Sequence, residues 1–362
     1  MRSSGPTSRD VAERAQVSQA TVSAVLNKSR YVSPTVVERV QAAITELAYQ
    51  PNAAARTLRT GRSGVIGLVV PSIVSPYWSS FVRSVSRVAA ERSLSLIITE
   101  SDEDDETERS RLMMLLERQI DGVLLATRSA ANRDFIARIA KGKRPLVLVD
   151  SYLEGVAVDS IRVDDETGVY QATTHLLGHN RRRIGLINLP ERRFGAGSRL
   201  AGYRRALEEH GVPLDPALLR HAGFSELDGF YATQELLALP APPDALLAGS
   251  HLLTIGALHA ATEAGRKIPQ DLALFGFDDT PWAQWTTPPL SLVDDPRDDL
   301  GIRAVSALLR RLERPDARPV RQALPTRLVL RRSCGCPYDQ ARPSAVRAID
   351  ATSRQQEGSH AT

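Results

Sequence analysis

The stretch Ser18-Gln19-Ala20-Thr21-Val22-Ser23-Ala24-Val25-Leu26-Asn27 predicts a short amphipathic helix that begins after a capping serine. A helix of this length is unstable alone, so its apolar side chains need partner helices. The side chains expected to pack inward are Ala20, Val22, Val25 and Leu26. The polar side chains expected to face outward are Gln19, Thr21, Ser23 and Asn27. Because these are small enough to enter a DNA major groove, we interpret the segment as a DNA-reading helix.

The flanking residues predict two more helices. Thr7 and Asp10 have the spacing of a capping box and start a helix over about residues 8–15, which a short turn connects to Ser18. Ser33-Pro34 begins a third helix, with apolar residues at helical spacing as far as Leu47. Three short helices with a tight turn between the first two form a helix-turn-helix unit. A three-helix bundle that binds another protein is the alternative.

The charge of this N-terminal segment favours DNA over a protein partner. Residues 1–62 contain nine Lys and Arg against four Asp and Glu, a surplus of five positive charges. The whole chain of 362 residues has a formal net charge of +4, so the remaining residues carry −1. A basic head on a nearly neutral body predicts a polyanionic partner for the head alone.

Residues 51–62 predict a second, shorter DNA-binding element. Pro51 can open a helix, the alanine-rich run up to Leu58 favours one, and Gly61 ends it. The piece is too short to be stable alone, so we expect it to order against a second copy or on DNA. Leu58 is then an exposed apolar residue suited to insertion between base pairs.

These motifs together resemble the LacI/GalR family of bacterial transcription regulators. The matching residues are Asp10-Val11-Ala12, Val17-Ser18, Thr21-Val22-Ser23, Val25-Leu26-Asn27, Val32-Ser33 and Pro51–Leu58. The resemblance implies a homodimer on a near-palindromic DNA operator, with reading helices in major grooves and hinge helices in the central minor groove. The DNA-binding residues that it implies are Thr7, Ser18, Gln19, Ala20, Thr21, Ser23, Ala24, Asn27, Tyr31, Ser33, Tyr49, Asn52, Ala55 and Leu58.

Two positions depart from the family pattern. Gln16 stands in the turn where glycine is common, and a left-handed conformation there costs roughly 1–2 kcal/mol. Ala24 replaces a frequent arginine of the reading helix. Arginine binds guanine through two hydrogen bonds, whereas alanine offers only an apolar contact such as one to a thymine methyl. We therefore expect Gln19 and Thr21 to carry more of the base discrimination.

From Gly64 onward, short apolar runs alternate with longer amphipathic stretches. The expected strands are Val65–Val70, Leu94–Thr99, Gly122–Leu125, Leu146–Val149, Ile161–Val163, Ile184–Ile187, Ala245–Ala248, Leu272–Phe277 and Leu290–Val293. The expected helices are Tyr77–Arg92, Glu106–Arg118, Gly168–Leu177, Ser198–Glu209, Gly229–Leu237 and Ile255–Ala264. This alternation predicts an α/β fold with parallel sheets covered by helices, and the length predicts two lobes.

The body also resembles the LacI/GalR family, whose sensor is like a periplasmic sugar-binding protein. The matching stretches are Ile66–Pro71, Asp121-Gly122-Val123, Asp164–Gly168, Leu200–Tyr203, Gly276–Asp279 and Thr287–Leu290. The expected domains are a DNA-binding head at 7–50, a hinge at 51–62, a two-lobed domain for effector binding and dimerisation at 63–337, and a disordered tail at 338–362. We expect one lobe over about 63–160 and 294–337, and the other over about 161–293.

The resemblance places a small-molecule effector between the lobes, at the carboxyl ends of strands. The effector-binding residues that it implies are Tyr77, Trp78, Asp150, Arg199, Phe224, Ser250 and Asp278. Aromatic faces, carboxylates and one arginine suit a polyhydroxylated, sugar-like ligand. The alternatives are core packing for the aromatic residues and a salt bridge for Arg199 and Asp278. Ser250 and His251 stand where many sugar-responsive members have Asn-Asp, so an ordinary hexose arrangement is not assumed.

Other constellations predict no chemistry. His175 and His179 have a spacing that suits metal ligands, but we interpret them as a helix end near basic residues. Cys334 and Cys336 could bind a metal together with other ligands, but we expect none to lie near them and interpret them as structural. Gly195-Ala196-Gly197 lacks the complete pattern of a phosphate-binding loop. We therefore expect no metal, no cofactor, no catalytic residues and no enzyme activity.

The N-terminal residues contain no signal peptide, and no apolar run is long enough to span a membrane. We expect a cytoplasmic bacterial protein, associated with the nucleoid through operator DNA. The leading prediction is a transcriptional regulator, most simply a repressor, whose operator affinity responds to a sugar-like metabolite. The alternatives are a transport-type sugar-binding protein and an enzyme on a two-lobed scaffold.

Overall fold

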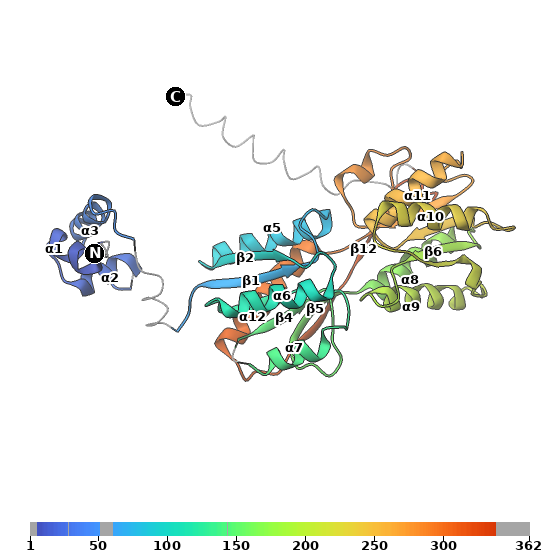
Figure 1. The fold of residues 1–362 in the computed structure, drawn as a ribbon. Coiled ribbons are helices and arrows are strands. Elements are labelled where there is room, and N and C mark those ends of the chain that lie inside the picture. The colour runs from blue at the N-terminus through green and yellow to red at the C-terminus, as the bar shows by residue number, and fades with distance from the viewer. Residues whose placement is uncertain (1–5, 28, 51–60, 143, 338–362) are drawn as a thin grey trace, which may run out of the picture. The chain divides into compact units, whose positions relative to one another are not determined.

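The computed structural model describes residues 6–27, 29–50, 61–142 and 144–337. The chain divides into two compact units, Met1–Ser63 and Gly64–Thr362 (Figure 1). The hinge residues Asn52, Ala55 and Leu58 and the tail 338–362 lie outside the described residues. No helix of the described residues is long and apolar enough to cross a membrane.

The smaller unit has the expected three helices: α1 (Ser8–Ala15), α2 (Gln19–Asn27) and α3 (Pro34–Glu46). One fully buried valine from each helix, Val11, Val22 and Val40, forms the core. The capping box of Thr7 and Asp10 is present, because each side chain bonds the backbone N–H of the other residue. Gln16 ends α1 in the left-handed conformation at φ 51°, so this turn carries the strain that its side chain imposes.

Two expectations for the smaller unit are wrong. Ala20 is exposed and Leu26 is 38% exposed, so neither packs inward, because α2 turns Val22, Ala24 and Val25 towards its partners. Ser33 occupies the position before α3, but its hydroxyl makes no capping hydrogen bond. Pro34 stands at the first helical position and has no backbone N–H, so one of the N–H groups that a cap would bond is absent.

The first lobe of the larger unit contains one sheet of parallel strands. Its order is β11-β5-β4-β3-β1-β2. The strands are β1 (Val65–Val70), β2 (Ser95–Glu100), β3 (Gly122–Leu125), β4 (Leu146–Val149), β5 (Asp159–Val163) and β11 (Arg321–Leu324). Helices α5 (Pro76–Glu91) and α12 (Arg297–Glu313) cover one face. Helices α6 (Asp105–Glu117) and α7 (Arg133–Ala140) cover the other.

The second lobe repeats this design with one change of direction. Its sheet has the order β12-β10-β9-β8-β6-β7, and only β12 is antiparallel to its neighbour among the described pairings. The strands are β6 (Ile184–Asn188), β7 (Leu219–His221), β8 (Ala245–Ala248), β9 (Ala273–Phe277), β10 (Ser291–Asp294) and β12 (Arg327–Val329). The helices, in two layers (Figure 1), are α8 (Asp165–Gly178) and α9 (Ala196–Glu209), and α10 (Glu226–Leu237) and α11 (His251–Glu263). Short 3-10 turns lie at η1 (Pro216–Leu218) and η2 (Pro281–Gln284).

The chain passes between the lobes at three places in the described residues: after β5, after β10 and after β11. The expected lobe boundaries are therefore wrong at two points. Residues 161–163 continue β5 in the first sheet, and residues 327–337 belong to the second lobe. The second correction has a clear cause, because β12 pairs with β10 and Ser333 donates a hydrogen bond to the Leu274 carbonyl of β9 at 2.6 Å.

Candidate functional site

The exposed end of α2 presents a polar surface. Ser18, Gln19 and Ala20 are exposed at its N-terminus, while Thr21 and Ser23 are half-buried. Ser18 caps the helix, since its hydroxyl accepts a hydrogen bond from the Thr21 N–H at 3.1 Å. The side chain of Gln19 is therefore the longest polar group of the expected set at the start of the helix.

Arg30 lies against this polar surface, which the sequence did not indicate. Its Nη2 donates to the Thr21 hydroxyl oxygen at 3.4 Å, and that oxygen also lies 2.9 Å from the Ser18 hydroxyl. The guanidinium keeps further N–H groups for an outside acceptor. The sequence feature that could have predicted this contact is a basic residue in the loop directly after the reading helix.

The expectation that Ala24 contacts a base is not supported by its burial. Ala24 is only 3% exposed, so its methyl group has almost no free surface. Thr21 and Ala24 are three residues apart and share one face of α2. Since Arg30 crosses this face to reach Thr21, an arginine is present on the helix surface even though position 24 lacks one.

The other residues expected at the DNA surface of the head differ in freedom. Thr7, Ser33 and Tyr31 are exposed, with Tyr31 at 88%. Asn27 is exposed, but its amide donates to the Ser23 carbonyl at 2.7 Å, so it caps its own helix in this conformation. Tyr49 is half-buried and packs against the core of the head.

A cavity lies where the strand ends of the two lobes meet. All seven residues expected to bind an effector line it, and the space between them in this conformation is small, about 30 Å³. The lining residues are Ser75, Tyr77, Trp78, Arg128, Asp150, Leu189, Arg199, Phe224, Ser250, Asp278 and Asp295. Most of them follow the carboxyl ends of parallel strands, the usual position of a ligand in such sheets.

Asp150 follows β4 and points its charge at Arg128, which follows β3. Arg128 Nη1 lies 3.2 Å from Asp150 Oδ2, and both side chains are at least four-fifths buried. Asp150 adopts a left-handed backbone at φ 51°, a strained conformation for a residue other than glycine. Burial raises the pKa of Asp150 to about 6, although Arg128 opposes this shift.

Asp278 provides the corresponding carboxylate after β9 in the second lobe. Its backbone is also left-handed, at φ 65°, and its Oδ2 lies 3.2 Å from His251 Nδ1. Burial alone would raise the pKa of Asp278, but the His251 hydrogen bond and nearby arginines together hold it below the usual value. Ser250 precedes His251 and caps α11 by accepting from the Leu253 N–H at 3.2 Å.

Arg199 on α9 is held from two sides in the cavity wall. It pairs with Asp165 at 2.9 Å and donates to the Gly249 carbonyl at 2.6 Å. Its guanidinium also stacks 4.5 Å from the centre of the Phe277 ring. Burial lowers the pKa of Arg199, but the surrounding carboxylates outweigh this effect and raise it.

Asp295 completes the cavity, and the sequence did not single it out. It follows β10 at one of the crossings between the lobes, and its Oδ1 is buried without a hydrogen-bond partner among the described residues. Burial and the charges of Asp278, Asp165 and Asp150 raise its pKa well above the ordinary value. A buried unpartnered polar atom is costly, so this carboxyl group is poised to receive a ligand hydrogen bond.

The aromatic lining residues come from both lobes. Tyr77 and Trp78 stand edge to face with ring centres 4.8 Å apart, and Trp78 packs further against Phe81 in the core. Phe224 of the second lobe is half-buried and lies edge-on to His251. Tyr77 and Trp78 therefore pack in the core as well as lining the cavity. Phe224 is more exposed than either of them.

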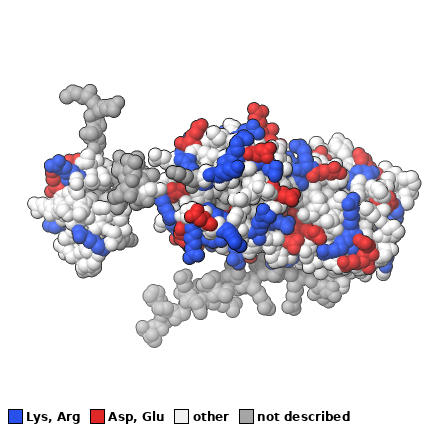
Figure 2. All heavy atoms as spheres, turned by 90° about the horizontal axis from the view of Figure 1, so that it is seen from below, with Lys and Arg blue, Asp and Glu red and all other residues white. Residues whose placement is uncertain are grey.

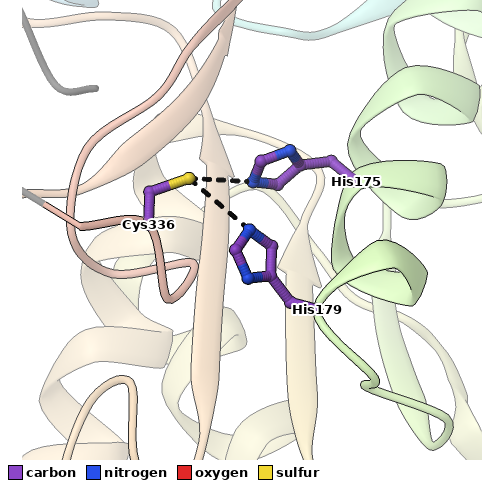
Figure 3. Close-up of side chains that lie close together, drawn as sticks. All are labelled: His175, His179 and Cys336. Atoms are coloured by element: carbon purple, nitrogen blue, oxygen red, sulfur yellow. Dashed lines mark hydrogen bonds between the residues drawn. The ribbon is translucent and has the colours of Figure 1, made fainter.

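The structure changes the interpretation of two motifs that were assigned no chemistry. His175, His179 and Cys336 have their ligand atoms within 4.8 Å of one another (Figure 3), and Cys334 also contacts His175. The expectation that no further ligands lie near the cysteines is wrong, because β12 brings them to α8. Burial lowers the pKa of His175 to about 4, so its imidazole is neutral.

The glycine loop before α9 is an unfavourable phosphate site. A Cβ atom on Gly195 would lie 2.8 Å from Asp165 Oδ2, so a carboxylate occupies the space beside the helix N-terminus. A phosphate there would face this negative charge.

Figure 2 shows that the larger unit carries both signs of charge interspersed on the face in view.

A helix-turn-helix head in one chain with a two-lobed binding fold defines a DNA-binding regulator. Comparisons with known proteins agree with this class. Residues 7–52 match the model described as bacterial regulatory proteins, lacI family, and residues 173–334 match a periplasmic binding protein-like domain.

Full-length relatives extend the match over nearly the whole chain. The ribose operon repressor of Haemophilus influenzae is 34% identical over 328 residues, covering 90% of this chain and 98% of the relative. A repressor of Escherichia coli named PurR is 34% identical over 330 residues, covering 90% and 96%. The structure of the Lac repressor dimer bound to operator and an anti-inducer has a TM-score of 0.81 at 28% identity, covering 91% and 99%.

The chain belongs to the LacI family of bacterial transcriptional regulators. It is a DNA-binding regulator with a small-molecule-binding domain, as the sequence predicted. The relatives are transcriptional repressors, so the alternatives of a transport protein and an enzyme are not favoured.

Proposed function

We propose that this protein is a homodimeric repressor whose affinity for a near-palindromic operator is controlled by a sugar-like effector bound between the lobes. The cavity carries this proposal, because it joins polar groups of both lobes around one space. Asp150 and Arg128 come from the first lobe, and Arg199 and Asp278 from the second.

The chemistry of the lining residues favours a ligand with several hydroxyl groups. Ionised carboxylates accept hydroxyl hydrogen bonds, and arginine donates them to hydroxyl and ring oxygens. An apolar aromatic face such as that of Phe224 covers the C–H face of a sugar ring. Arg128, which lines the cavity, has its Nε buried without a hydrogen-bond partner among the described residues, which gives the ligand a further site.

A ligand that touches both lobes can regulate the head only through differential binding. The effector must bind one relative position of the lobes more tightly than the other, and it then shifts the population by that difference. We propose that this shift reaches the hinge at residues 51–62, whose Asn52, Ala55 and Leu58 would contact the central minor groove. Whether the effector releases the repressor or strengthens its binding follows from which position it favours.

For ligand binding, we expect titration calorimetry of the full-length protein with pentoses, hexoses and disaccharides to identify a sugar class. Phe224→Ala should then weaken binding of the best sugar by about tenfold or more, because the ring loses its apolar cover. Phe230→Ala is a matched control, since Phe230 is also half-buried beside a histidine but lies outside the cavity. Equal affinity losses in both variants would contradict the assignment of the cavity.

For DNA binding, we expect specific retardation of promoter fragments that contain a near-palindromic site. Gln19→Ala should weaken this binding, because Gln19 is exposed at the reading end of α2. Gln41→Ala on α3 provides the control, as Gln41 is equally exposed but away from α2. Equal retardation of all DNA at moderate salt would exclude sequence-specific reading.

We further propose that the protein acts in the bacterial cytoplasm on chromosomal DNA and does not transform its ligand. Its relatives are named as repressors, and a repressor needs only to bind its effector, without converting it to a product. Recovery of an unchanged sugar after prolonged incubation tests this point, and a modified sugar would contradict it.

A further inference from the structure

We propose that His175, His179, Cys334 and Cys336 form a zinc-binding site in the second lobe. The four residues come from two distant parts of the sequence: the histidines from α8 and its C-terminal end, and the cysteines from the segment after β12. Figure 3 shows three of them, His175, His179 and Cys336, whose ligand atoms lie within 4.8 Å of one another. The site lies apart from the effector cavity, whose lining includes none of these residues.

Three sulfur–nitrogen distances in the cluster match those around a tetrahedral zinc ion. With usual zinc bond lengths, a sulfur and a nitrogen ligand stand about 3.6 Å apart. Here Cys336 Sγ lies 3.4 Å from His175 Nε2 and 3.5 Å from His179 Nε2. Cys334 Sγ lies 3.3 Å from the same nitrogen of His175.

Weak hydrogen bonds are the alternative explanation for this convergence. Cys336 can donate its single proton to one imidazole and accept from the Nε2–H of the other. A cation instead accepts lone pairs from all four side chains at once. Both cysteines are free thiols and both are buried, at 0% and 5% exposure, which leaves them available as ligands.

The backbone around the four residues is arranged to bring them together. His175 and His179 are four residues apart, so they share one face of α8. Gly335 separates the two cysteines in a turn at φ 103°, a conformation that residues with a side chain rarely adopt. Both histidines are partly exposed, which gives an ion a path from solvent.

The donor set selects the ion and its role. Two thiolates with two imidazoles in a tetrahedral arrangement favour zinc over magnesium or calcium, which prefer oxygen ligands. Four protein ligands leave no open position for a reacting water, which is typical of a structural site. The ion would clamp the segment after β12 onto α8 and so stabilise the second lobe.

The test uses full-length protein that is reduced, stripped with a chelator and titrated with Zn²⁺ alone. We expect one tightly bound ion per chain and a rise in Tm on binding. His179→Gln should weaken zinc binding by about 100-fold or more, and the double variant C334S/C336S should abolish it. His259→Gln should leave zinc binding unchanged, because His259 is an exposed histidine of α11 away from the cluster.

Co²⁺ reports the ligand type independently of stability. We expect intense tetrahedral Co²⁺ bands with thiolate charge transfer in the wild type, and their loss in C334S/C336S. Circular dichroism checks the folding of each variant, and His179→Gln at the end of α8 provides the test if the cysteine variants do not fold. Three results would each overturn the proposal. The wild type could bind zinc no more tightly than His179→Gln does, or give a weak octahedral cobalt spectrum. Cys334 and Cys336 could also form a stable disulfide under reducing conditions.

Discussion

The surface at the start of α2 and the cavity between the lobes differ in how exposed their polar groups are and in whether those groups already have partners. The start of α2 exposes neutral polar groups, Ser18 and Gln19, and the DNA partners that we propose for them come from outside the chain. The cavity buries charged groups such as Arg199 and Asp278, which already pair within the protein. Substitutions in the cavity should therefore affect folding as well as binding, whereas those on the reading surface should affect mainly binding.

The largest expected effect lies in the cavity wall. Arg199→Met leaves Asp165 buried and unpaired, so we expect the free energy of unfolding of the larger unit to fall by about 3–5 kcal/mol. Urea unfolding followed by circular dichroism measures this change. Arg205→Met also breaks a pair between α9 and α8, but that pair is more than two-fifths exposed, so the loss should stay within about 1 kcal/mol. Similar losses of unfolding free energy in both variants would contradict the claim that the buried pair stabilises the fold more than the exposed pair.

On the reading surface, Arg30→Ala should reduce binding without destabilising the head. We expect operator affinity to fall by about 1–3 kcal/mol if the guanidinium contacts a base, with relaxed preference at one operator position. Gel retardation with single-base operator variants measures both effects. Arg39→Ala on α3 is the control for a general loss of positive charge. A uniform loss over all sequences would make Arg30 a phosphate contact instead.

The buried carboxylate Asp150 should make effector binding depend on pH. Its pKa of about 6 means that the accepting, ionised form dominates only above pH 6. We therefore expect affinity for an uncharged sugar to fall about tenfold between pH 7 and pH 5. The groups that face Asp150 are Arg128, Asp165, Arg199, Tyr77 and Asp295, and titration calorimetry over this range measures the dependence.

Two further observations check that assignment. Asp150→Asn should bind weakly and lose this pH dependence, whereas a wild-type affinity that is flat between pH 5 and pH 7 would contradict it. The folded-state pKa lies above the ordinary value, so the folded protein holds this proton more tightly. The contribution of Asp150 to stability is therefore largest below pH 4 and falls as the pH rises through 6.

The smallest expected effect separates backbone strain from binding. Gln16→Gly should stabilise the head by about 1 kcal/mol, because glycine adopts the left-handed conformation without strain. Thermal unfolding of the head detects this gain, and operator affinity should not fall. Glu13→Gly in the middle of α1 should have the opposite sign, at about 1 kcal/mol less stable. A loss of stability in Gln16→Gly would mean that contacts of the glutamine outweigh the strain.

The sequence predicted local structure well where side chains repeat at a clear period. The limits of α1, β1, β3, β4 and β8 were predicted to the residue, because capping and buried apolar runs mark their ends. It missed β11 and β12, since both are short and begin with an exposed arginine. It also missed α7 and α12, although α12 buries a continuous face that includes Leu300 and Leu308.

The effector-site residues named from the family resemblance all line one cavity, and their role in binding an effector stays a prediction. The family resemblance named seven residues that the fold brings to one cavity, and the confirmed α/β fold explains why. Arg128 and Asp295, which also line the cavity, were not named, because their roles come from charges that neighbouring strands bring close. His175 and Cys336 are 161 residues apart in the chain, so no local motif could show their contact.

The last crossing of the chain has a consequence for protein engineering. Because β12 returns to the second lobe after β11, neither lobe is a continuous piece of sequence. A fragment that ends before residue 327 would leave β10 as an open edge, ready to pair with another chain and aggregate. A single nick between the lobes would leave them joined by the other crossings. Splitting this protein into its two lobes therefore requires joining two separate segments of the sequence for each lobe, which a simple truncation cannot do.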